Sequence, residues 1–536
     1  MVEAPVLEDT DRTSGRDALR RNILSAMAVA GAVRSTLGPF GLDKLLVDQE
    51  GHSTVTNDGM TVLDEARIEH PTALRLVEAS RTVGRSVADG TTSTVLLSAE
   101  MLANAWNLIG RGVHPAAIVQ GFSEALGLAK RELETMSLPR DEMTMALTVA
   151  TSMAGKGDDA LRALVGRLAS EAAKRVIDPK TGMARPDHVR VIGRTGGRIG
   201  DTDLVPGLVL SKHRIDPNTP ARLKGGRIML VDGGIEPRSP SSDGHLRITD
   251  PTMLEAFRAR SREQLEDLIV RIASQGVNLL VVREGIDDLA VAPLREAGIV
   301  AYRRVDRSDL DLLARATGAK VVHDPRTVNT DDFGAFDSSD AMDIGGRMHW
   351  ILRAEHGRGA TLFIRGSTEE VLDEVERCFD DALGVATGLV SEGTAVPGAG
   401  ATHIAIARHL RREASRVEGR SQLAVEAWAD ALEVIPRALS ENAGRDPIDD
   451  LLAINAAQAS ASGPAHHCSM DLRTGAIVDV VELGILDPTS VIEMSLSAAT
   501  DAAVSVLRVD DVLWAQKDPT VPEEVEERLA EASNPS

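Results

Sequence analysis

The stretch VNLLVVREGIDDLAVAPLREAGIVAYRRVDRSDLDLLARATGAKVVH, residues 277–323, alternates short apolar runs with segments of helical spacing. The apolar runs are VNLLVV (277–282), IVAY (299–302) and AKVVH (319–323). Each run has the length of a buried strand, and the segments near 287–297 and 308–317 have the spacing of amphipathic helices. Because strands that alternate with helices pair in parallel, this stretch predicts an α/β domain.

The alternation extends toward the N-terminus and then stops. GRIMLVD (226–232) is a further predicted strand, and a helix is expected near 252–274. Between them GGIEPRSPSSDGHLR (233–247) is rich in Gly, Pro and Ser, which predicts an exposed excursion. Helical spacing dominates both flanks, from 16 to 37 and again from 402 onward. The order helical, α/β, helical indicates one domain inserted into another.

The N-terminal part is predicted to be mainly helical, with polar loops. Its first helix ends at the breaker pair Gly38-Pro39. Two short strands, 44–48 and 53–56, are expected before a turn at Asn57-Asp58-Gly59. Helices follow and are interrupted at ADGTT (88–92). The sequence therefore predicts several Gly-containing loops between helices.

Composition excludes several classes of protein. The chain has 536 residues and a formal net charge of −22, which argues against nucleic acid as a partner because phosphate binding needs a cationic surface. Aromatic residues make up only 2%, so stacking platforms for bases are not expected. With 43% apolar residues and this length, we expect about three to four domains with large cores.

The sequence also indicates a compartment. Two cysteines, Cys378 and Cys468, cannot form a disulfide framework, which is typical of the reducing cytoplasm. The first residues, MVEAPVLEDTD, are acidic where a signal peptide would be basic. No apolar run approaches the roughly 18 residues of a membrane span. We therefore expect a cytoplasmic protein with no membrane partner.

Three loops combine Gly, Thr and Asp: TLGPFG (36–41), NDGMT (57–61) and ADGTTS (88–93). Glycines let backbone amides approach phosphate oxygens, a helix N-terminus adds a positive dipole, and a carboxylate can hold Mg²⁺. Each loop alone is more typical of an ordinary turn. No GxxxxGK[ST] motif occurs, and the glycines of TGGRIG (195–200) predict a hairpin turn rather than a dinucleotide site.

Longer motifs carry a resemblance to a known family, and they are spread from about residue 14 to about 515. They include TLGPFGLDKLLVD (36–48), VTNDGMTVLDEARIEHP (55–71), ADGTTSTVLLSAEML (88–102), ATSMAGK (150–156), FIRGSTEEVLDEVERCFDDAL (363–383), VPGAGATHIAIARHLR (396–411) and ENAGRDPID (441–449). In this order they resemble group II chaperonins, the thermosome and its eukaryotic cytosolic relatives.

The resemblance implies a multi-domain α+β fold. It implies a mainly α-helical equatorial domain from both chain ends, a small α/β intermediate domain, and an inserted α/β apical domain with a helical protrusion. The expected boundaries are 1–143 and 397–536 for the equatorial domain, 144–205 and 358–396 for the intermediate domain, and 206–357 for the apical domain. The equatorial domain is expected to end in an acidic tail, EEVEERLAEASNPS (523–536).

The resemblance also implies ATP and Mg²⁺ as ligands. Phosphates would be bound by Thr36, Leu37, Gly38 and Pro39 and by Gly90, Thr91, Thr92 and Ser93, with Asp89 as the metal ligand. Asp58 and Asp381 would position and activate the attacking water, and Lys156 would sense the γ-phosphate. Gly400 and Asp487 would contact the nucleoside.

Three residues depart from the family pattern. Ala88 replaces the first glycine of GDGTT, Phe40 replaces the lysine of TLGPKG, and Ala399 replaces a third glycine of VPGAG. If position 88 needs a positive φ or a close phosphate approach, a methyl group there would weaken nucleotide binding. The carboxylates and Lys156 are retained, so hydrolysis is expected.

The implied function is that of an ATPase that binds and encloses unfolded or partly folded proteins. Its other partners would be the same or paralogous chaperonin subunits in stacked rings. Two alternatives remain open at this point. One is a structural ring subunit with impaired ATPase activity, and the other is a metabolic Mg²⁺-dependent ATPase or kinase that acts on a small acceptor.

Overall fold

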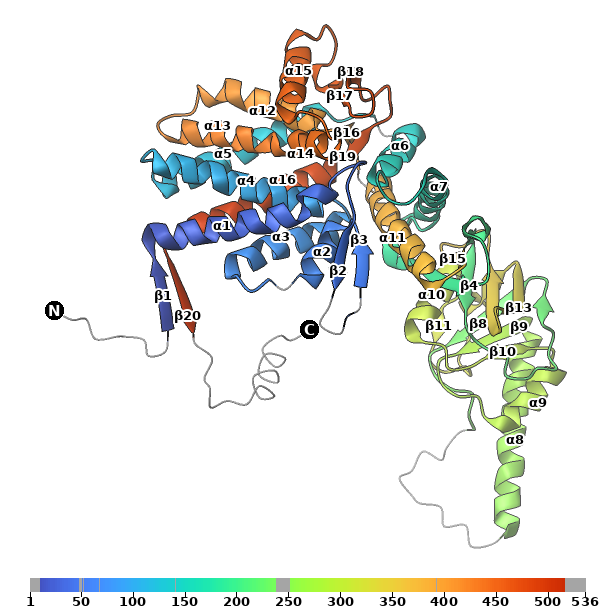
Figure 1. The fold of residues 1–536 in the computed structure, drawn as a ribbon. Coiled ribbons are helices and arrows are strands. Elements are labelled where there is room, and N and C mark those ends of the chain that lie inside the picture. The colour runs from blue at the N-terminus through green and yellow to red at the C-terminus, as the bar shows by residue number, and fades with distance from the viewer. Residues whose placement is uncertain are drawn as a thin grey trace.

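The computed structural model describes residues 10–47, 51, 53–66, 68–139, 141–237, 251–391 and 393–515. Their apolar side chains gather in several cores along an elongated molecule, with a helical bundle at one end and an α/β part at the other (Figure 1). The structure thus combines helices with several small sheets, as expected for an α+β protein.

The first core is built from both ends of the chain. Its long helices are α1 (Gly15–Val33), α3 (Pro71–Val87), α4 (Thr91–Gly110), α5 (Pro115–Thr135), α12 (Ala401–Ala414), α13 (Ser421–Leu432), α14 (Val434–Asn442) and α16 (Thr489–Leu507). They bury apolar residues at helical spacing, which explains why segments so far apart in sequence pack together. Trp428 is fully buried among them, and its indole N–H donates to Thr500 Oγ1 at 3.0 Å.

Short elements decorate this bundle. They are the strands β1 (Thr10–Ser14) and β20 (Asp511–Ala515), β2 (Lys44–Val47) and β3 (Ser53–Thr56), β16 (Ala395–Pro397) and β19 (Leu486–Pro488), and β17 (Cys468–Asp471) and β18 (Ala476–Asp479), with the helices α2 (Gly59–Glu65) and α15 (Pro447–Ser460). Each pair of strands is antiparallel. The pairing of β1 with β20 joins the two ends of the described chain (Figure 1).

The second core lies between the bundle and the α/β part. Its elements are the helices α6 (Glu142–Ser152), α7 (Asp159–Arg175) and α11 (Glu369–Ser391) and the strands β4 (Val189–Thr195), β5 (Asp203–Val205) and β15 (Ala360–Gly366). The central strand β15 is parallel to β4 and antiparallel to β5. The prediction of a hairpin turn at 195–200 is therefore wrong, because this segment links two strands that lie on opposite sides of β15.

The α/β part contains the predicted parallel strands. The order β10 (Val300–Tyr302), β9 (Val277–Val282), β8 (Gly226–Val231), β11 (Val321–Val322) is parallel throughout, with β12 (Gly334–Phe336) antiparallel to β8. The helices α8 (Pro251–Ser274), α9 (Asp288–Glu296) and α10 (Arg307–Thr317) alternate with the strands, as the sequence predicts. The two faces of the sheet pack into two different cores. The strands are therefore apolar on both faces.

A second, antiparallel sheet covers one face of the first. Its order is β6 (Gly207–Leu210), β14 (Arg347–Arg353), β13 (Ser338–Ile344), β7 (Arg222–Leu223). Tyr302 of the first sheet stacks on Trp350 of the second, with ring centroids 4.0 Å apart, and both side chains are buried. These large rings fix how the two sheets pack.

Helix α8 extends beyond the body of the α/β part (Figure 1). Its C-terminal half packs on the sheet through Leu265, Leu268, Ile269 and Ile272, whereas Arg258 and Arg260 in the preceding turns are exposed. The predicted excursion at 233–247 falls largely outside the described residues, as does the acidic C-terminal end.

Helix α16 is, among the described residues, the one helix long and apolar enough to cross a membrane. Of its most apolar 18 residues, 56% are buried, and Leu496, Ala499 and Ala503 belong to the first core. These contacts are those of a core helix.

Candidate functional site

Local structure fixes two of the predicted carboxylates. Asp58 is the N-cap of α2, and its Oδ2 accepts from the Thr61 amide at 2.9 Å and from the Thr61 hydroxyl at 2.7 Å. Asp89 lies between Ala88 and Gly90, which both have positive φ, and its Oδ1 accepts from the Gly90 amide at 2.6 Å. Capping and left-handed turns therefore hold both side chains in defined positions.

The glycine loops lie against one another. A Cβ on Gly59 would lie 2.1 Å from Thr92 Oγ1, so NDG and ADGTTS touch. The side-chain amide of Asn57 donates to the Gly155 carbonyl at 2.9 Å, and a Cβ on Gly155 would lie 2.8 Å from the Gly38 carbonyl oxygen. The loops predicted to bind phosphates therefore meet in one place, together with the segment that ends at Lys156.

Helix α11 brings Asp381 to this place. Lys156 Nζ donates to Asp381 Oδ2 at 2.5 Å. Burial raises the pKa of Asp381, and the ammonium of Lys156 opposes that rise. Burial alone would lower the pKa of Lys156, but the carboxylates of Asp381 and Asp89 raise it above its ordinary value, so the lysine stays charged. The apolar stripe of α11, which includes Phe379 and Leu383, packs into the second core.

The C-terminal half supplies Asp487 and Gly400. Strand β19 pairs Asp487 with Val396 of β16, and the Gly398 amide donates to the Ile485 carbonyl at 2.9 Å. Burial raises the pKa of Asp487 to about 7, and the charge of Asp89 contributes to the rise. Gly400 is the left-handed N-cap of α12. The two halves of the chain thus meet at the same loops.

The first turn of α4 is suited to an anion. Its N-cap is Gly90, which has no side chain to accept hydrogen bonds from the amides of Thr91, Thr92 and Ser93. Free amides and the helix dipole favour a phosphate at this position. A Cβ on Gly90 would lie 2.6 Å from Ser495 Oγ, so α16 packs directly against this loop.

The TLGP loop is partly occupied by its own contacts. Thr36 is buried, and its hydroxyl donates to the Val33 carbonyl at 2.9 Å, whereas Leu37 packs against the first core. Gly38 has a φ of 84°, and a Cβ there would lie 2.2 Å from Leu439 Cδ2. Pro39 is exposed next to it. The backbone of the loop, rather than its side chains, faces the other loops.

Sequence reasoning missed Asn442. Its side-chain amide donates to the carbonyls of Arg34 and Leu37 at 3.0 and 2.8 Å, and its neighbour Glu441 pairs with Arg34 at 2.7 Å. These contacts hold the TLGP loop from α14. Asn442 belongs to the motif ENAGRDPID (441–449), which is the sequence signal for this contact.

The departures from the family pattern have structural counterparts. Ala88 and Ala399 both adopt left-handed conformations, with φ of 57° and 52°, so these positions do take the backbone that favours glycine. The Ala88 methyl faces Gly384 of α11. Phe40 is 36% exposed beside the TLGP loop.

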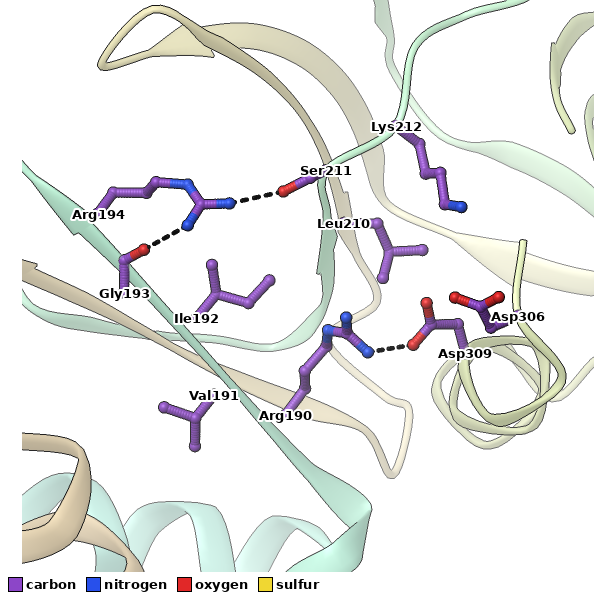
Figure 2. Close-up of a pocket in the computed structure, with 10 residues that line it drawn as sticks. All are labelled: Arg190, Val191, Ile192, Gly193, Arg194, Leu210, Ser211, Lys212, Asp306 and Asp309. Carbon is purple, nitrogen blue, oxygen red and sulfur yellow. Dashed lines mark hydrogen bonds and ion pairs between the residues drawn. The ribbon is translucent and has the colours of Figure 1, made fainter. Parts of the chain in front are cut away.

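A cavity of about 410 Å³ lies apart from these loops, where β4 meets β6 and α10 (Figure 2). Arg190 forms an ion pair with Asp309, and Arg194 donates to Ser211 Oγ at 2.8 Å. These bonds cross from the second core to the α/β part. None of the predicted site residues lines this cavity.

Comparison with known proteins gives a consistent result. A family model described as the TCP-1/cpn60 chaperonin family matches residues 29–517. The chain is 39% identical to a thermosome subunit of Methanocaldococcus jannaschii over 524 residues, which cover 96% of each protein. It is 40% identical to a thermosome subunit of Methanopyrus kandleri, over 95% of this chain and 94% of that protein. It is 38% identical to the thermosome subunit beta of Archaeoglobus fulgidus, over 96% and 95%.

Proposed function

Since the chain belongs to the TCP-1/cpn60 chaperonin family and is a chaperonin subunit, we propose that it is an ATP-dependent molecular chaperone. The observation that carries this proposal is the meeting of glycine loops and carboxylates from both halves of the chain around Lys156 and Asp381. Amides and glycines suit the phosphates, and the carboxylates suit a divalent cation and a water molecule.

The residues fit Mg²⁺ bound together with a nucleotide. Mg²⁺ in such sites is commonly held by one or two carboxylates, with phosphates and water as the other ligands. Asp89 would hold it, since its Oδ1 is fixed by the Gly90 amide at the start of α4. When bound, Mg²⁺ neutralises charge on the phosphates. Gly90, Thr91, Thr92 and Ser93 would bind those phosphates from one side and residues 36–39 from the other.

Hydrolysis requires a positioned water and a group that takes its proton. We assign these roles to Asp58 and Asp381. Burial raises the pKa of Asp381, which makes it a stronger base, and Lys156 fixes its orientation. Lys156 would donate to the γ-phosphate, and Asp487 would bind the ribose from β19 beside Gly400.

The proposal includes the domain division expected from the sequence. Residues 1–143 and 397–536 would form the equatorial domain, 144–205 and 358–396 the intermediate domain, and 206–357 the apical domain. The first core draws its residues from Leu19–Met136 and Val396–Leu507, and the second from Val149–Leu204 and Ala360–Val390. These separate cores support the division.

The apical domain would close over the client protein. The segment 233–247 and the helix that follows are assigned to a built-in lid, and the projection of α8 beyond the α/β body supports this (Figure 1). Unfolded or partly folded proteins expose apolar surface and aggregate, and enclosure would isolate them. Mg·ATP binding and hydrolysis would drive the closure.

The same or paralogous subunits would assemble into stacked rings. Strands β2 and β3 form a two-stranded hairpin that packs against the first core through Leu46, whereas its other apolar side chains Leu45, Val47 and Val55 are 66%, 63% and 56% exposed. A two-stranded sheet with an exposed apolar face is not stable alone in water. A second copy of the chain would cover it, with the β1–β20 pair offering further strand edges.

Two free cysteines fit a cytoplasmic location.

The test is ATP hydrolysis by the largest particle that purified protein forms on size exclusion. We expect turnover in a ring-sized particle only with Mg²⁺, its loss in Asp89→Ala, and ATP-dependent suppression of aggregation of a chemically denatured client. A ring-sized particle without turnover would overturn the ATPase and identify a structural subunit. Turnover confined to a small species would overturn the chaperonin assembly.

A further inference from the structure

Helix α11 touches the loop that carries Asp89 at one crowded point. An ideal Cβ built on Gly384 would lie 2.1 Å from the Cβ of Ala88 and 3.6 Å from its Cα. The optimal separation between two carbon atoms that are not bonded is about 3.5–4.0 Å, so 2.1 Å would be a severe clash. The Ala88 methyl therefore occupies the space that any side chain at position 384 would need.

The Ala88 methyl cannot move away. Ala88 has a φ of 57° as the C-cap of α3, and its amide donates to the Gly84 carbonyl at 2.9 Å. The next two residues are Asp89, whose carboxylate is bound to the Gly90 amide, and Gly90, with a φ of 80°. Because the backbone sets the direction of a methyl group, the contact is a rigid one.

The contact lies between two cores, whereas the ion pair of Asp381 lies within one. Lys156 and Asp381 both belong to segments of the second core. Ala88 belongs to the link between α3 and α4 of the first core. Gly384 follows Asp381 by three residues, so both residues lie on the same face of α11. The contact between Gly384 and Ala88 limits how closely α11 approaches the first core. It therefore sets the distance of Asp381 from Asp58 and Asp89.

We propose that Gly384 is a positioning residue for ATP hydrolysis: its missing side chain lets α11 seat against Ala88, so that Asp381 reaches the phosphate loops. Gly384 and Ala88 form a matched pair, because the space between α11 and residue 88 holds one methyl group, and the Ala88 methyl group already fills it. This inference rests on the proposed ATPase. It assigns to Ala88 a packing role that the family pattern does not show.

The experiment compares wild type with Gly384→Ala, Ala88→Gly and the double variant. In Gly384→Ala the two methyl groups compete, so α11 must move outward. In the double variant the new methyl group faces only the Cα of residue 88, at 3.6 Å, which is an ordinary contact. Gly388→Ala is the matched control, because it lies one turn further along α11 and a Cβ there meets nothing within 4 Å.

We expect Gly384→Ala to lower kcat about 10- to 100-fold, since misplacement of a catalytic group by about 1 Å has an effect of that size. The Kd for ATP, measured without turnover, should change less than about threefold, because the phosphate loops are intact. The double variant should recover kcat to within about threefold of wild type, and Gly388→Ala should retain it. Wild-type kcat in Gly384→Ala, or no recovery in the double variant, would overturn the proposal.

A second measurement separates this inference from the ATPase itself. Both glycine-to-alanine changes favour helix, so Gly388→Ala should raise the thermal midpoint slightly. Gly384→Ala should lower the midpoint, and the double variant should restore it. If wild type hydrolyses no ATP, the proposed function fails. The thermal midpoints of the variants still show whether Gly384 and Ala88 are in the tight contact described above. A midpoint for Gly384→Ala equal to that of Gly388→Ala would show that it does not.

Discussion

Lys156 and Asp381 form an ion pair with 2.5 Å between Nζ and Oδ2, although 225 residues separate them in the chain. The pair is partly buried, with 23% of the lysine side chain and 38% of the aspartate side chain exposed. It joins α11 to the segment after α6, and that segment touches both the NDG and TLGP loops through Gly155. A movement of α11 would therefore be transmitted to the loops proposed to bind phosphate.

The first prediction concerns Asp381. Asp381→Asn keeps the shape of the side chain but removes the base, so we expect kcat for ATP hydrolysis to fall about 10²- to 10⁴-fold. Asp380→Asn is the control, because Asp380 is the adjacent carboxylate on α11 and is exposed. Steady-state phosphate release measures both variants. Equal kcat values for the two would contradict the assignment of Asp381.

The second prediction is a pH dependence from Asp487, whose pKa burial and Asp89 raise to about 7. The unfolded value is about 3.9, so between about pH 4 and 7 the folded protein binds a proton that the unfolded chain has released. Stability therefore falls as pH rises through this window. Asp487→Asn removes that loss, so its gain in thermal midpoint over wild type should grow from about pH 5 to about pH 8. Asp501→Asn is the control, because Asp501 is exposed on α16. A gain independent of pH would contradict the prediction.

The third prediction concerns Asn442. Asn442→Ala removes two hydrogen bonds that hold the backbone at Arg34 and Leu37. At about 0.5–1.5 kcal/mol each, their loss should weaken ATP binding about 10-fold through the loosened TLGP loop. Asn455→Ala serves as control, since its side-chain amide donates to the Leu451 carbonyl within α15 and does not touch the TLGP loop. Calorimetric titration measures both, and an unchanged Kd for Asn442→Ala would contradict the prediction.

The fourth prediction concerns the cavity of Figure 2. Asp309 is only 3% exposed and pairs with Arg190, which is 34% exposed. Arg190→Met leaves the carboxylate buried without its partner, at a cost of about 3 kcal/mol, the lower end for a buried pair because Arg190 is partly exposed. Arg222→Met should cost less than about 1 kcal/mol, because Arg222 is 69% exposed in its pair with Asp340.

The cost for Arg190→Met should also depend on pH. Burial already raises the pKa of Asp309. Without Arg190 the carboxyl group would take up a proton more readily, so the destabilisation should be smaller at about pH 5 than at about pH 8. Thermal unfolding at the two pH values measures this. Equal losses for Arg190→Met and Arg222→Met would show that the pair does not hold the second core to the α/β part.

The fifth prediction concerns assembly. Leu45→Asp with Val47→Asp places two charges on the exposed face of the β2–β3 hairpin, so we expect a smaller particle on size exclusion with an unchanged circular dichroism spectrum. Met143→Asp is the control, because Met143 is 72% exposed on α6, away from the hairpin. A ring-sized particle in the double variant would exclude the hairpin from the interface between copies.

Local patterns predicted most elements correctly. The alternation in residues 277–323 predicts the parallel order of β9 and β10, because period and length are properties of short segments. The interruption at ADGTT likewise marks the gap between α3 and α4. The hairpin expected at 195–200 was wrong because the partner of β4 is β15, which lies far away in sequence.

The candidate site was predictable only in its residue types. Capping of α2 by Asp58 follows from an N-cap pattern, but the contact of Ala88 with Gly384 depends on how two cores meet. Asn442 bonds backbone carbonyls that 405 and 408 residues separate from it. No local pattern encodes such distances, so these residues emerge only from the tertiary structure.

The pairing of β1 with β20 bears on how the protein is made. A nascent chain leaves the ribosome N-terminus first. The first core nevertheless includes residues of α16, and β1 pairs with β20 (Asp511–Ala515). Helices α1 to α5 pack on one another, but the apolar faces that α12, α13 and α16 cover stay exposed until those helices have emerged. The α/β part is continuous in sequence and can fold before them. The helical bundle is therefore the last part of this subunit to be completed, and the nascent chain exposes apolar surface of the kind that chaperones recognise.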